Sequence, residues 1–353
     1  MDIKTTLFTA TYLLLWLNKT RHEIEKNPMN KKLTVKILKV FVTAFLIMYI
    51  FSKVDIMNLL ITIKSAHIYL LIIAFLSNGI GILVRVYKWK IILLVQEINV
   101  PFKTLLTFSF TSAFFGIFLP TAYGGDIVRA YDVSKFSNKK FESVASILVD
   151  RMSGAVALFF IATVSLLVGH DLIKDIRIVL LTIGVLLLLL SLISIIFNEK
   201  GIKIISKIFT FFFNKDIVSN AYNKFHIYRY HKRALIEIFA LSLFAQIIAI
   251  VYYPLIAYSF GLNIPLVYFL IVIPIILVIL MVPISIGGIG VREGAFLFFF
   301  TNIGVLPHEA VSIAVVAFGL YLLWSLIGGV VYIMRDPKKA NPNRPLDSDP
   351  SNN

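Results

Sequence analysis

The chain has 353 residues, of which 59% are hydrophobic and only 15% are charged, and its mean hydropathy is +0.88. These values exclude an ordinary soluble domain and indicate an integral membrane protein. The absence of cysteine excludes disulfides and thiolate metal sites. The formal charge of +15 is best explained by basic residues beside membrane spans, so nucleic acid is not expected as a partner.

Residues 1–30 are predicted to form an N-terminal extension that lies on the membrane surface. The apolar stretch Leu7–Leu17 is shorter than a span, and no small-residue cleavage site follows it, so a signal peptide is not indicated. A ninth, short span is the alternative interpretation. A start of translation at Met29, before a lysine-rich flank, is a further hypothesis.

Residues 31–334 are predicted to form one all-α membrane domain. A span needs about 20 apolar residues to cross roughly 30 Å of hydrocarbon. Eight apolar runs satisfy or approach this length: Leu33–Phe51, Ile68–Val86, Phe102–Leu119, Val144–Gly169, Ile176–Phe197, Leu235–Gly261, Leu266–Val282 and Ala310–Met334. The remaining residues, 335–353, are rich in Pro, Asn and Asp and are predicted to be a disordered polar tail.

Two of the apolar runs end in the same pattern, Pro-x-x-x-Gly-Gly-x-x-Val-Arg, at residues 120–129 and 283–292. Proline ends an incoming helix, and glycine permits positive backbone angles or close approach of another group. The predicted breaks are at Pro120, Gly124, Gly125, Pro283, Gly287, Gly288 and Gly290. Irregular backbone at membrane depth must line a protein cavity, and paired interrupted helices are typical of transporters.

The distribution of lysine and arginine predicts how these two segments enter the membrane. Residues 198–233 carry eight basic side chains against Glu199 and Asp216, whereas residues 261–265 carry no charge. If every apolar run crossed fully, the basic segment would lie outside, against the positive-inside rule. If both motif segments enter and leave on one face, every basic cluster is cytoplasmic. The sequence therefore predicts about six full spans and two interrupted or re-entrant segments in an inverted repeat.

Two arginines follow the breaks at the same offset. The guanidinium groups of Arg129 and Arg292 can form two-pronged bonds with phosphate, so a phospholipid headgroup is the expected ligand. Asp126 is placed to cap the helix that restarts after the first break, so that free backbone amides face a cavity. The alternative is that the glycines only permit close packing and the arginines pair with Asp126, Asp132 or Glu293.

A second group of polar residues lies within the run that begins near Glu142. Asp150 and Arg151 are predicted to lie roughly 12 Å deep, where charges need partners. Ser146, Asp150 and Gly154 recur every four residues and should form a polar strip that faces the protein interior. Asp150 is expected to pair with one of the two motif arginines, in a role that either fixes helix packing or handles a headgroup or ion.

Basic and aromatic residues also gather at the end of the second apolar run. We interpret Arg85, Lys88, Trp89 and Lys90 as interfacial anchors within a cytoplasmic turn, because such residues commonly flank a span.

Several segments together resemble a known family. These are Leu-Pro-x-x-x-Gly-Gly-Asp followed by Val-Arg-Ala-Tyr, then SILVDRMSG, PISIGGIGVREGA and GLYLLWSLIGGVVY. They are similar to the flippase-like transmembrane domain of lysylphosphatidylglycerol synthases, the multiple peptide resistance factor family, over residues 32 to 334. The resemblance implies translocation of a modified phospholipid, without the synthase activity of the family's separate cytosolic domain. It marks as family-type positions Gly124, Gly125, Asp126, Arg129, Asp150, Arg151, Gly287, Gly288, Arg292 and Glu293.

The predicted function is therefore binding and translocation of a phospholipid or lipid-linked headgroup by a multi-pass protein of the cell membrane, with both termini cytoplasmic. The expected partners are the lipid, the bilayer and either a second copy of the chain or a separate lipid-modifying enzyme. No cofactor and no metal are expected, since no Walker A or His-Glu-x-x-His pattern is present. Two alternatives are a membrane glycosyltransferase that acts on polyprenyl phosphate and a non-transporting accessory subunit.

Overall fold

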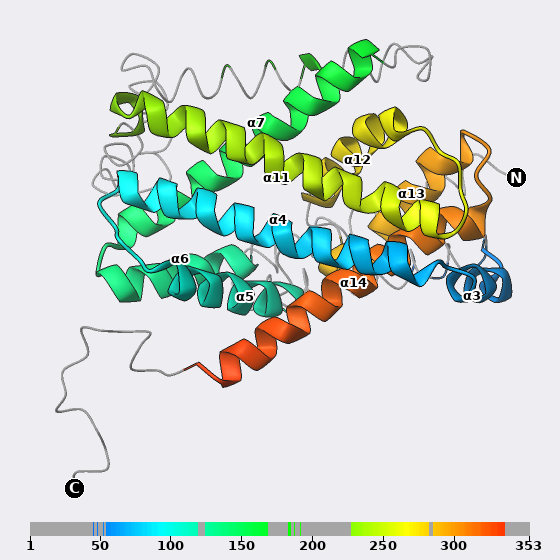
Figure 1. The fold of residues 1–353 in the computed structure, drawn as a ribbon, viewed down its shortest axis with the longest axis horizontal. Helices are drawn as coiled ribbons and strands as arrows, with labels where there is room; N and C mark the ends of the chain where they lie inside the picture. The colour runs from blue at the N-terminus through cyan, green and yellow to red at the C-terminus, as the bar shows by residue number, and fades with distance from the viewer. Residues whose placement is uncertain are drawn as a thin grey trace, which may run out of the picture.

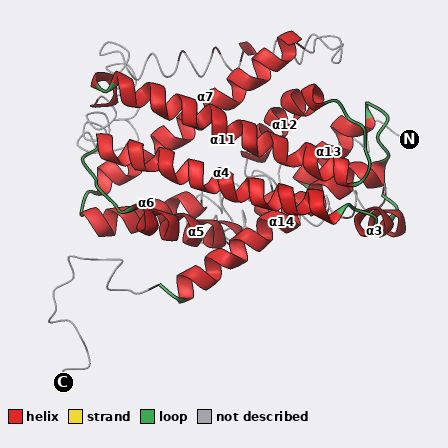
Figure 2. Cartoon of the chain, viewed as in Figure 1, coloured by secondary structure: helices red, strands yellow, loops and turns green. Residues whose placement is uncertain are grey.

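The computed structural model describes residues 54–118, 124–168, 227–281 and 285–335, and isolated helical residues at 45, 48, 52, 183, 184, 187 and 191. The described part of the chain is helical and contains no strand (Figure 2). Four of its helices are long and apolar enough to cross a membrane: α4 (Ile68–Val95), α7 (Lys140–Val168), α11 (Lys232–Ser259) and α14 (Pro307–Ile333). The predicted all-α, polytopic membrane class is confirmed.

Some of the predicted segments lie outside the described residues. These are the N-terminal extension at 1–30, the spans Leu33–Phe51 and Ile176–Phe197 apart from the isolated residues named above, most of the basic segment 198–233 and the tail after residue 335. The total of six full spans therefore stays a prediction.

The antiparallel pair of α4 and α11 forms the centre of the bundle (Figure 1). The amide of His67, just before α4, donates to the carbonyl of Ser259 at the end of α11, at 2.8 Å. The 3-10 turn η2 (Ile227–Tyr230) precedes α11, and its Tyr228 hydroxyl donates to the carbonyl of Ile92 near the end of α4, at 2.9 Å. Each helix thus begins where the other ends, which defines an α4 N-terminal end and an α4 C-terminal end of the molecule.

The first motif segment forms a hairpin at the α4 C-terminal end. It consists of α5 (Phe102–Phe118) and α6 (Gly124–Ser137). Lys139, which follows α6, donates from Nζ to the carbonyls of Gln96 at 3.4 Å and Glu97 at 3.2 Å. Because Gln96 and Glu97 directly follow α4, the chain leaves and returns at the same end of the bundle. The described parts of this segment therefore start and finish at one end of the bundle, as a re-entrant segment would.

The second motif segment forms a hairpin at the opposite end. It contains α12 (Leu266–Met281), the 3-10 turn η3 (Ile286–Gly288) and α13 (Val291–Thr301). The Tyr268 hydroxyl near the start of α12 donates to the Phe299 carbonyl near the end of α13, at 2.5 Å. Since α12 follows shortly after the end of α11, this hairpin starts and finishes at the α4 N-terminal end (Figure 1). The two hairpins thus have the opposed directions that an inverted repeat requires.

Helix α14 packs closely on the first hairpin. Gly328 has no room for a Cβ because the carbonyl oxygen of Phe110 in α5 occupies that space, and a Cβ on Gly329 would lie 2.7 Å from the ring of Phe114. Just after α14, Arg335 forms two bonds with Asp132 of α6, at 2.9 and 3.1 Å. Small residues at such a contact let helices approach closely, which is how membrane helices gain packing energy. The short helix α3 (Ile56–Lys64) also packs against α14.

One prediction about α4 is wrong. The predicted span ended at Val86 and was followed by a cytoplasmic turn, but the helix continues to Val95, and Arg85, Lys88 and Lys90 all lie within it. No proline or glycine interrupts residues 82–95, so the backbone has no local reason to stop.

Candidate functional site

The first break is held by a close contact between backbones. Pro120 lies outside the described residues, but the glycines that follow it are visible at the start of α6. A Cβ on Gly125 would lie 2.7 Å from the carbonyl oxygen of Ser112 in α5, so only glycine fits. The Ser112 hydroxyl donates to the Gly125 carbonyl at 2.7 Å and closes the tip of the hairpin. At Gly125 the need for glycine therefore comes from the close approach of Ser112.

The second break depends on backbone conformation. Pro283 lies outside the described residues. Gly287, Gly288 and Gly290 have φ values of 62°, 75° and 84°, in the left-handed region that glycine adopts without steric cost. Helix α13 begins directly after them, and the Glu293 carboxylate accepts the Gly290 amide at 2.6 Å. The Glu293 side chain thus satisfies one of the backbone amides at the start of this helix.

The two breaks open into adjoining cavities. The first-motif cavity has a volume of about 520 Å³ and is lined by Lys88, Asp126, Arg129, Asp150 and Arg151, among others. The second-motif cavity has a volume of about 380 Å³ and is lined by Gly287, Gly288 and Arg292, among others. Both are lined by Asn78, Arg85, Gly116, Leu277 and Tyr321. The hairpin tips therefore meet at a common wall in the interior of the bundle.

An ion-pair network fills one side of the first-motif cavity. Lys88 Nζ lies 2.8 Å from one oxygen of Asp150, and Arg129 Nη2 lies 3.1 Å from the other. The same Arg129 nitrogen is 2.7 Å from Asp126, whose second oxygen is 2.6 Å from Arg151 Nε. Four of these side chains are largely buried, whereas that of Arg151 is 43% exposed. Charges removed from water require such partners.

The network corrects the predicted role of Asp126. Helix α6 starts at Gly124, so Asp126 lies within its first turn, and its carboxylate binds Arg129 and Arg151 instead of capping backbone amides. Of the two partners proposed for Asp150, the structure has Arg129. Ion-pair partners depend on tertiary packing, which local spacing does not report.

The predicted interfacial anchors are also corrected. The Lys88 side chain is only 5% exposed, and Trp89 is fully buried. The Trp89 indole donates to the hydroxyl of Ser146 at 3.2 Å, and the Arg129 guanidinium lies 4.9 Å from the centre of the Trp89 ring. Residues of this type serve as anchors at a helix end, but α4 continues past them and turns them toward α7.

The predicted polar strip on α7 is confirmed. Ser146 and Asp150 are buried and bonded to α4, and the Gly154 carbonyl accepts a hydrogen bond from Gln246 of α11 at 3.0 Å. A face with a polar residue every four positions therefore points toward other helices, as expected for polar groups in a membrane.

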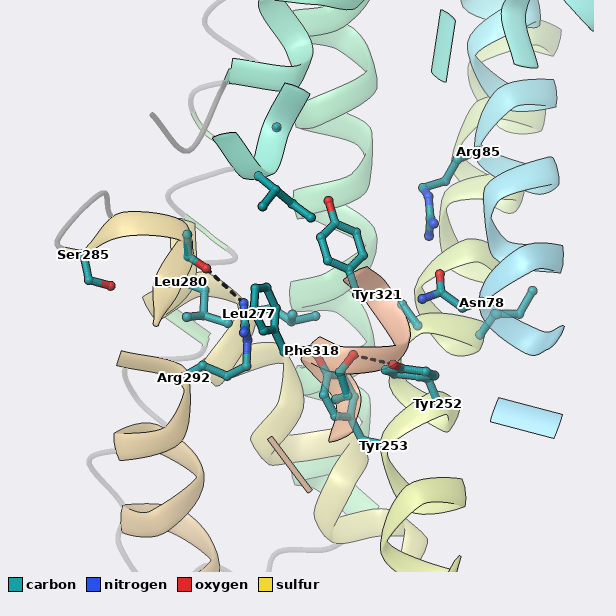
Figure 3. Close-up of a pocket in the computed structure, with 17 residues that line it drawn as sticks. Asn78, Arg85, Tyr252, Tyr253, Leu277, Leu280, Ser285, Arg292, Phe318 and Tyr321 are labelled. Atoms are coloured by element: carbon teal, nitrogen blue, oxygen red, sulfur yellow. Dashed lines mark hydrogen bonds between the residues drawn. The ribbon is translucent and has the colours of Figure 1, made fainter. Parts of the chain in front are cut away.

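Arg292 is less well paired than Arg129. Its Nη2 donates to the Gly287 carbonyl at 3.1 Å, and its guanidinium lies 4.4 Å from the centre of the Phe318 ring (Figure 3). The Glu293 carboxylate is 3.9 Å from Nη1, which is beyond hydrogen-bonding distance. Nη1 is buried and has no hydrogen-bond partner among the described residues.

Sequence reasoning missed three residues that line both cavities. Arg85 and Asn78 come from α4 and Tyr321 from α14, and all three are drawn in Figure 3. Arg85 makes no hydrogen bond or ion pair within the part of the chain that the structure describes. The available signal was Asn78, a polar residue in the middle of an apolar run, which lies seven residues before Arg85 and so on the same helical face.

The arrangement can bind an anion or exchange ion-pair partners. Among the described residues, no group of three histidine, aspartate or glutamate side chains could hold a metal ion. The chemistry available here comes from guanidinium, ammonium and carboxylate groups.

Comparison with known proteins places the chain in a family. No curated protein and no solved structure matches the chain. A family model described as the lysylphosphatidylglycerol synthase TM region matches residues 36–329, which include both hairpins and both cavities. The match covers most of the 353 residues. The chain therefore belongs to the lysylphosphatidylglycerol synthase transmembrane region family.

Proposed function

We propose that the protein binds the headgroup of a phospholipid or lipid-linked substrate in the joined cavities and moves it between leaflets of the cell membrane. The observation that supports this proposal is the meeting of two opposed hairpins at cavities with a common wall. Among the described residues that line the two cavities, five are cationic, namely Arg85, Lys88, Arg129, Arg151 and Arg292, and two are carboxylates, namely Asp126 and Asp150. This excess suits a phosphate-bearing headgroup.

The motif residues would take different parts in this process. Arg292 has a buried nitrogen available for phosphate, whereas Arg129 must first release one of its two carboxylates. That exchange is feasible because Asp150 keeps its contact with Lys88, and Asp126 keeps its contact with Arg151. Glu293 would hold the start of α13 in place and balance the charge of Arg292. Binding of phosphate would thereby loosen the contacts that fix the first hairpin.

Transport would proceed by relative movement of the two hairpins. Inverted repeats with discontinuous helices expose a central site alternately to each side of a membrane. The driving force would be a lipid gradient or the membrane potential, which contributes about 2.3 kcal/mol per charge per 100 mV. We place both termini in the cytoplasm on the basis of the basic segments, and a lipid-modifying enzyme would supply the substrate.

The direct test is transfer of a labelled phospholipid between leaflets of reconstituted vesicles. Arg129→Ala and Arg292→Ala should each reduce the transfer rate about tenfold or more, because charge-assisted hydrogen bonds contribute about 1.5–3 kcal/mol. Arg233→Ala is the matched control, since the Arg233 side chain is 96% exposed and lies away from both cavities. Normal transfer by both variants, with folded protein verified by size-exclusion chromatography, would reject the proposal.

The two alternative functions give different results. Formation of a glycolipid from an added sugar donor and polyprenyl phosphate would favour the enzyme. Absence of both transfer and copurifying lipid, measured by mass spectrometry of the purified protein, would favour the accessory subunit.

A further inference from the structure

The second-motif cavity differs from its neighbour in its charges. Its lining contains two arginines, Arg85 and Arg292, and none of its described lining residues is an aspartate or glutamate. The described carboxylate beside Arg292 is that of Glu293, at 3.9 Å, and one of its oxygens already accepts a hydrogen bond from the Gly290 amide. This cavity therefore holds cationic charge that the protein itself balances poorly.

Some hydrogen-bond donors in this cavity have no acceptor among the described residues. Arg292 Nη1 and the Ser285 hydroxyl are buried, and neither has a hydrogen-bond partner in the described part of the protein. Arg85 likewise makes no hydrogen bond or ion pair to the residues that the structure describes. Leaving buried donors unsatisfied costs free energy, and a buried charge without a partner costs more. An anion bound beside Arg292 would supply the acceptor that Nη1 lacks.

The two arginines lie on different sides of the cavity. Figure 3 shows Arg292 on one side and Arg85 on the other, with Tyr321 between them. The Tyr252 hydroxyl is already occupied by the Ala317 carbonyl, at 2.6 Å, and Phe318 and Leu277 form apolar walls. Apolar walls with a few polar groups are typical of sites that select one orientation of a ligand.

We propose that the second-motif cavity binds the phosphate of a lipid headgroup with net negative charge, and that Arg85 is the specificity-determining cation. The inference rests on the proposed function for the lipid source of the phosphate, and it names the substrate class as anionic. A headgroup that carries an added amine, such as a lysyl ester, would bring a positive charge toward Arg85 and Arg292. The carboxylates among the described lining residues of the two cavities are Asp126 and Asp150, and both are already paired with Lys88, Arg129 or Arg151.

Binding by the purified full chain in detergent tests this inference. The probes are short-chain phosphatidylglycerol, short-chain lysylphosphatidylglycerol and inorganic phosphate. The wild-type protein should bind phosphatidylglycerol at least about tenfold more tightly than the lysyl ester. Arg85→Gln should weaken phosphatidylglycerol binding about tenfold or more, since it removes one charge-assisted hydrogen bond. Arg233→Gln, the same change at an exposed site, should leave both affinities unchanged.

A second variant keeps the test decisive if Arg85→Gln does not fold. Asn78→Asp retains Arg85 and adds a carboxylate to the lining of both cavities, so it should weaken phosphatidylglycerol binding and narrow the preference over the lysyl ester. Tighter binding of the lysyl ester by the wild type would overturn the inference. So would unchanged binding in the folded variants, or binding of inorganic phosphate but of neither lipid.

The outcome is separable from that of the proposed function. Arg85-dependent binding of phosphatidylglycerol without transfer in vesicles would reject translocation and keep the anionic site. Transfer that is equally fast for both lipids, and unaffected by Arg85→Gln, would keep translocation and reject the anionic site.

Discussion

The two copies of the repeated motif share a sequence pattern but differ in their surroundings. Arg129 in the first copy contacts Asp126 at 2.7 Å and Asp150 at 3.1 Å. Among the described residues, no carboxylate lies within hydrogen-bonding distance of Arg292 in the second copy, and its buried Nη1 has no hydrogen-bond partner. The motif thus specifies where a guanidinium group lies relative to a break, whereas other helices decide whether that group is available to a ligand.

The glycines of the two copies also serve different purposes. Gly125 is required because the Ser112 carbonyl lies too close for a Cβ, while Gly287 has open space but a φ of 62°. Duplication of a pattern therefore preserves a bend without preserving its physical cause. Glycine substitutions in the two bends should therefore have unequal effects.

Asp150→Ala should have the largest effect on stability, because it leaves the buried Lys88 without its carboxylate and takes one of two partners from Arg129. Breaking a buried ion pair costs about 3–5 kcal/mol. We expect little folded protein, measured by size-exclusion chromatography and by the melting temperature in detergent. The double variant Lys88→Met, Asp150→Leu should recover part of the loss, and a wild-type melting temperature for Asp150→Ala would contradict a structural role for the network.

Gly125→Ala and Gly287→Ala compare the two bends directly. The first forces a backbone shift in α5 or α6 and should cost about 1–3 kcal/mol, as overpacking does. The second adds a Cβ in open space, so it should cost only the strain of a positive φ, about 1 kcal/mol. The melting temperature should fall further for Gly125→Ala. The reverse order would show that the first bend relaxes more easily than its contacts suggest.

Glu293→Ala should have the smallest effect, because it removes one capping bond from the short helix α13. Loss of a helix cap costs about 0.5–2 kcal/mol. The Gly290 amide would then lose its acceptor, and Arg292 would lose its nearest negative charge. We expect a small drop in melting temperature together with tighter binding of phosphatidylglycerol. Weaker binding would indicate that Glu293 orients Arg292 for the ligand.

The sequence predicted the opposed hairpins because two physical rules acted on separate observations. Proline and glycine indicated where the helices are interrupted, and the basic segments indicated that the interrupted segments return to their side of entry. Neither rule reports tertiary partners. The bonds of Lys88 to Asp150 and of Arg335 to Asp132 join residues that are far apart in the sequence.

The predicted end of α4 was also wrong, and this error concealed Arg85 as a residue that could bind a ligand in the cavities. Positive charge near the end of an apolar run is typical of an interface, but a helix of 28 residues carries Arg85 and Lys88 past that point into contact with other helices. The composition of one helix cannot distinguish a basic residue at the membrane interface from one that faces the interior of the bundle. The position of α7, which supplies the carboxylate for Lys88, decides between them.

The ion pair between Arg335 and Asp132 makes α14 a connection between the two hairpins. The helix starts beside α13 of the second hairpin. Arg335, two residues after its end, forms hydrogen bonds with Asp132 of α6 in the first hairpin. A straight helix of 27 residues measures about 40 Å and resists compression along its axis. In the movement that we propose for transport, α14 would therefore transmit a tilt of one hairpin to the other.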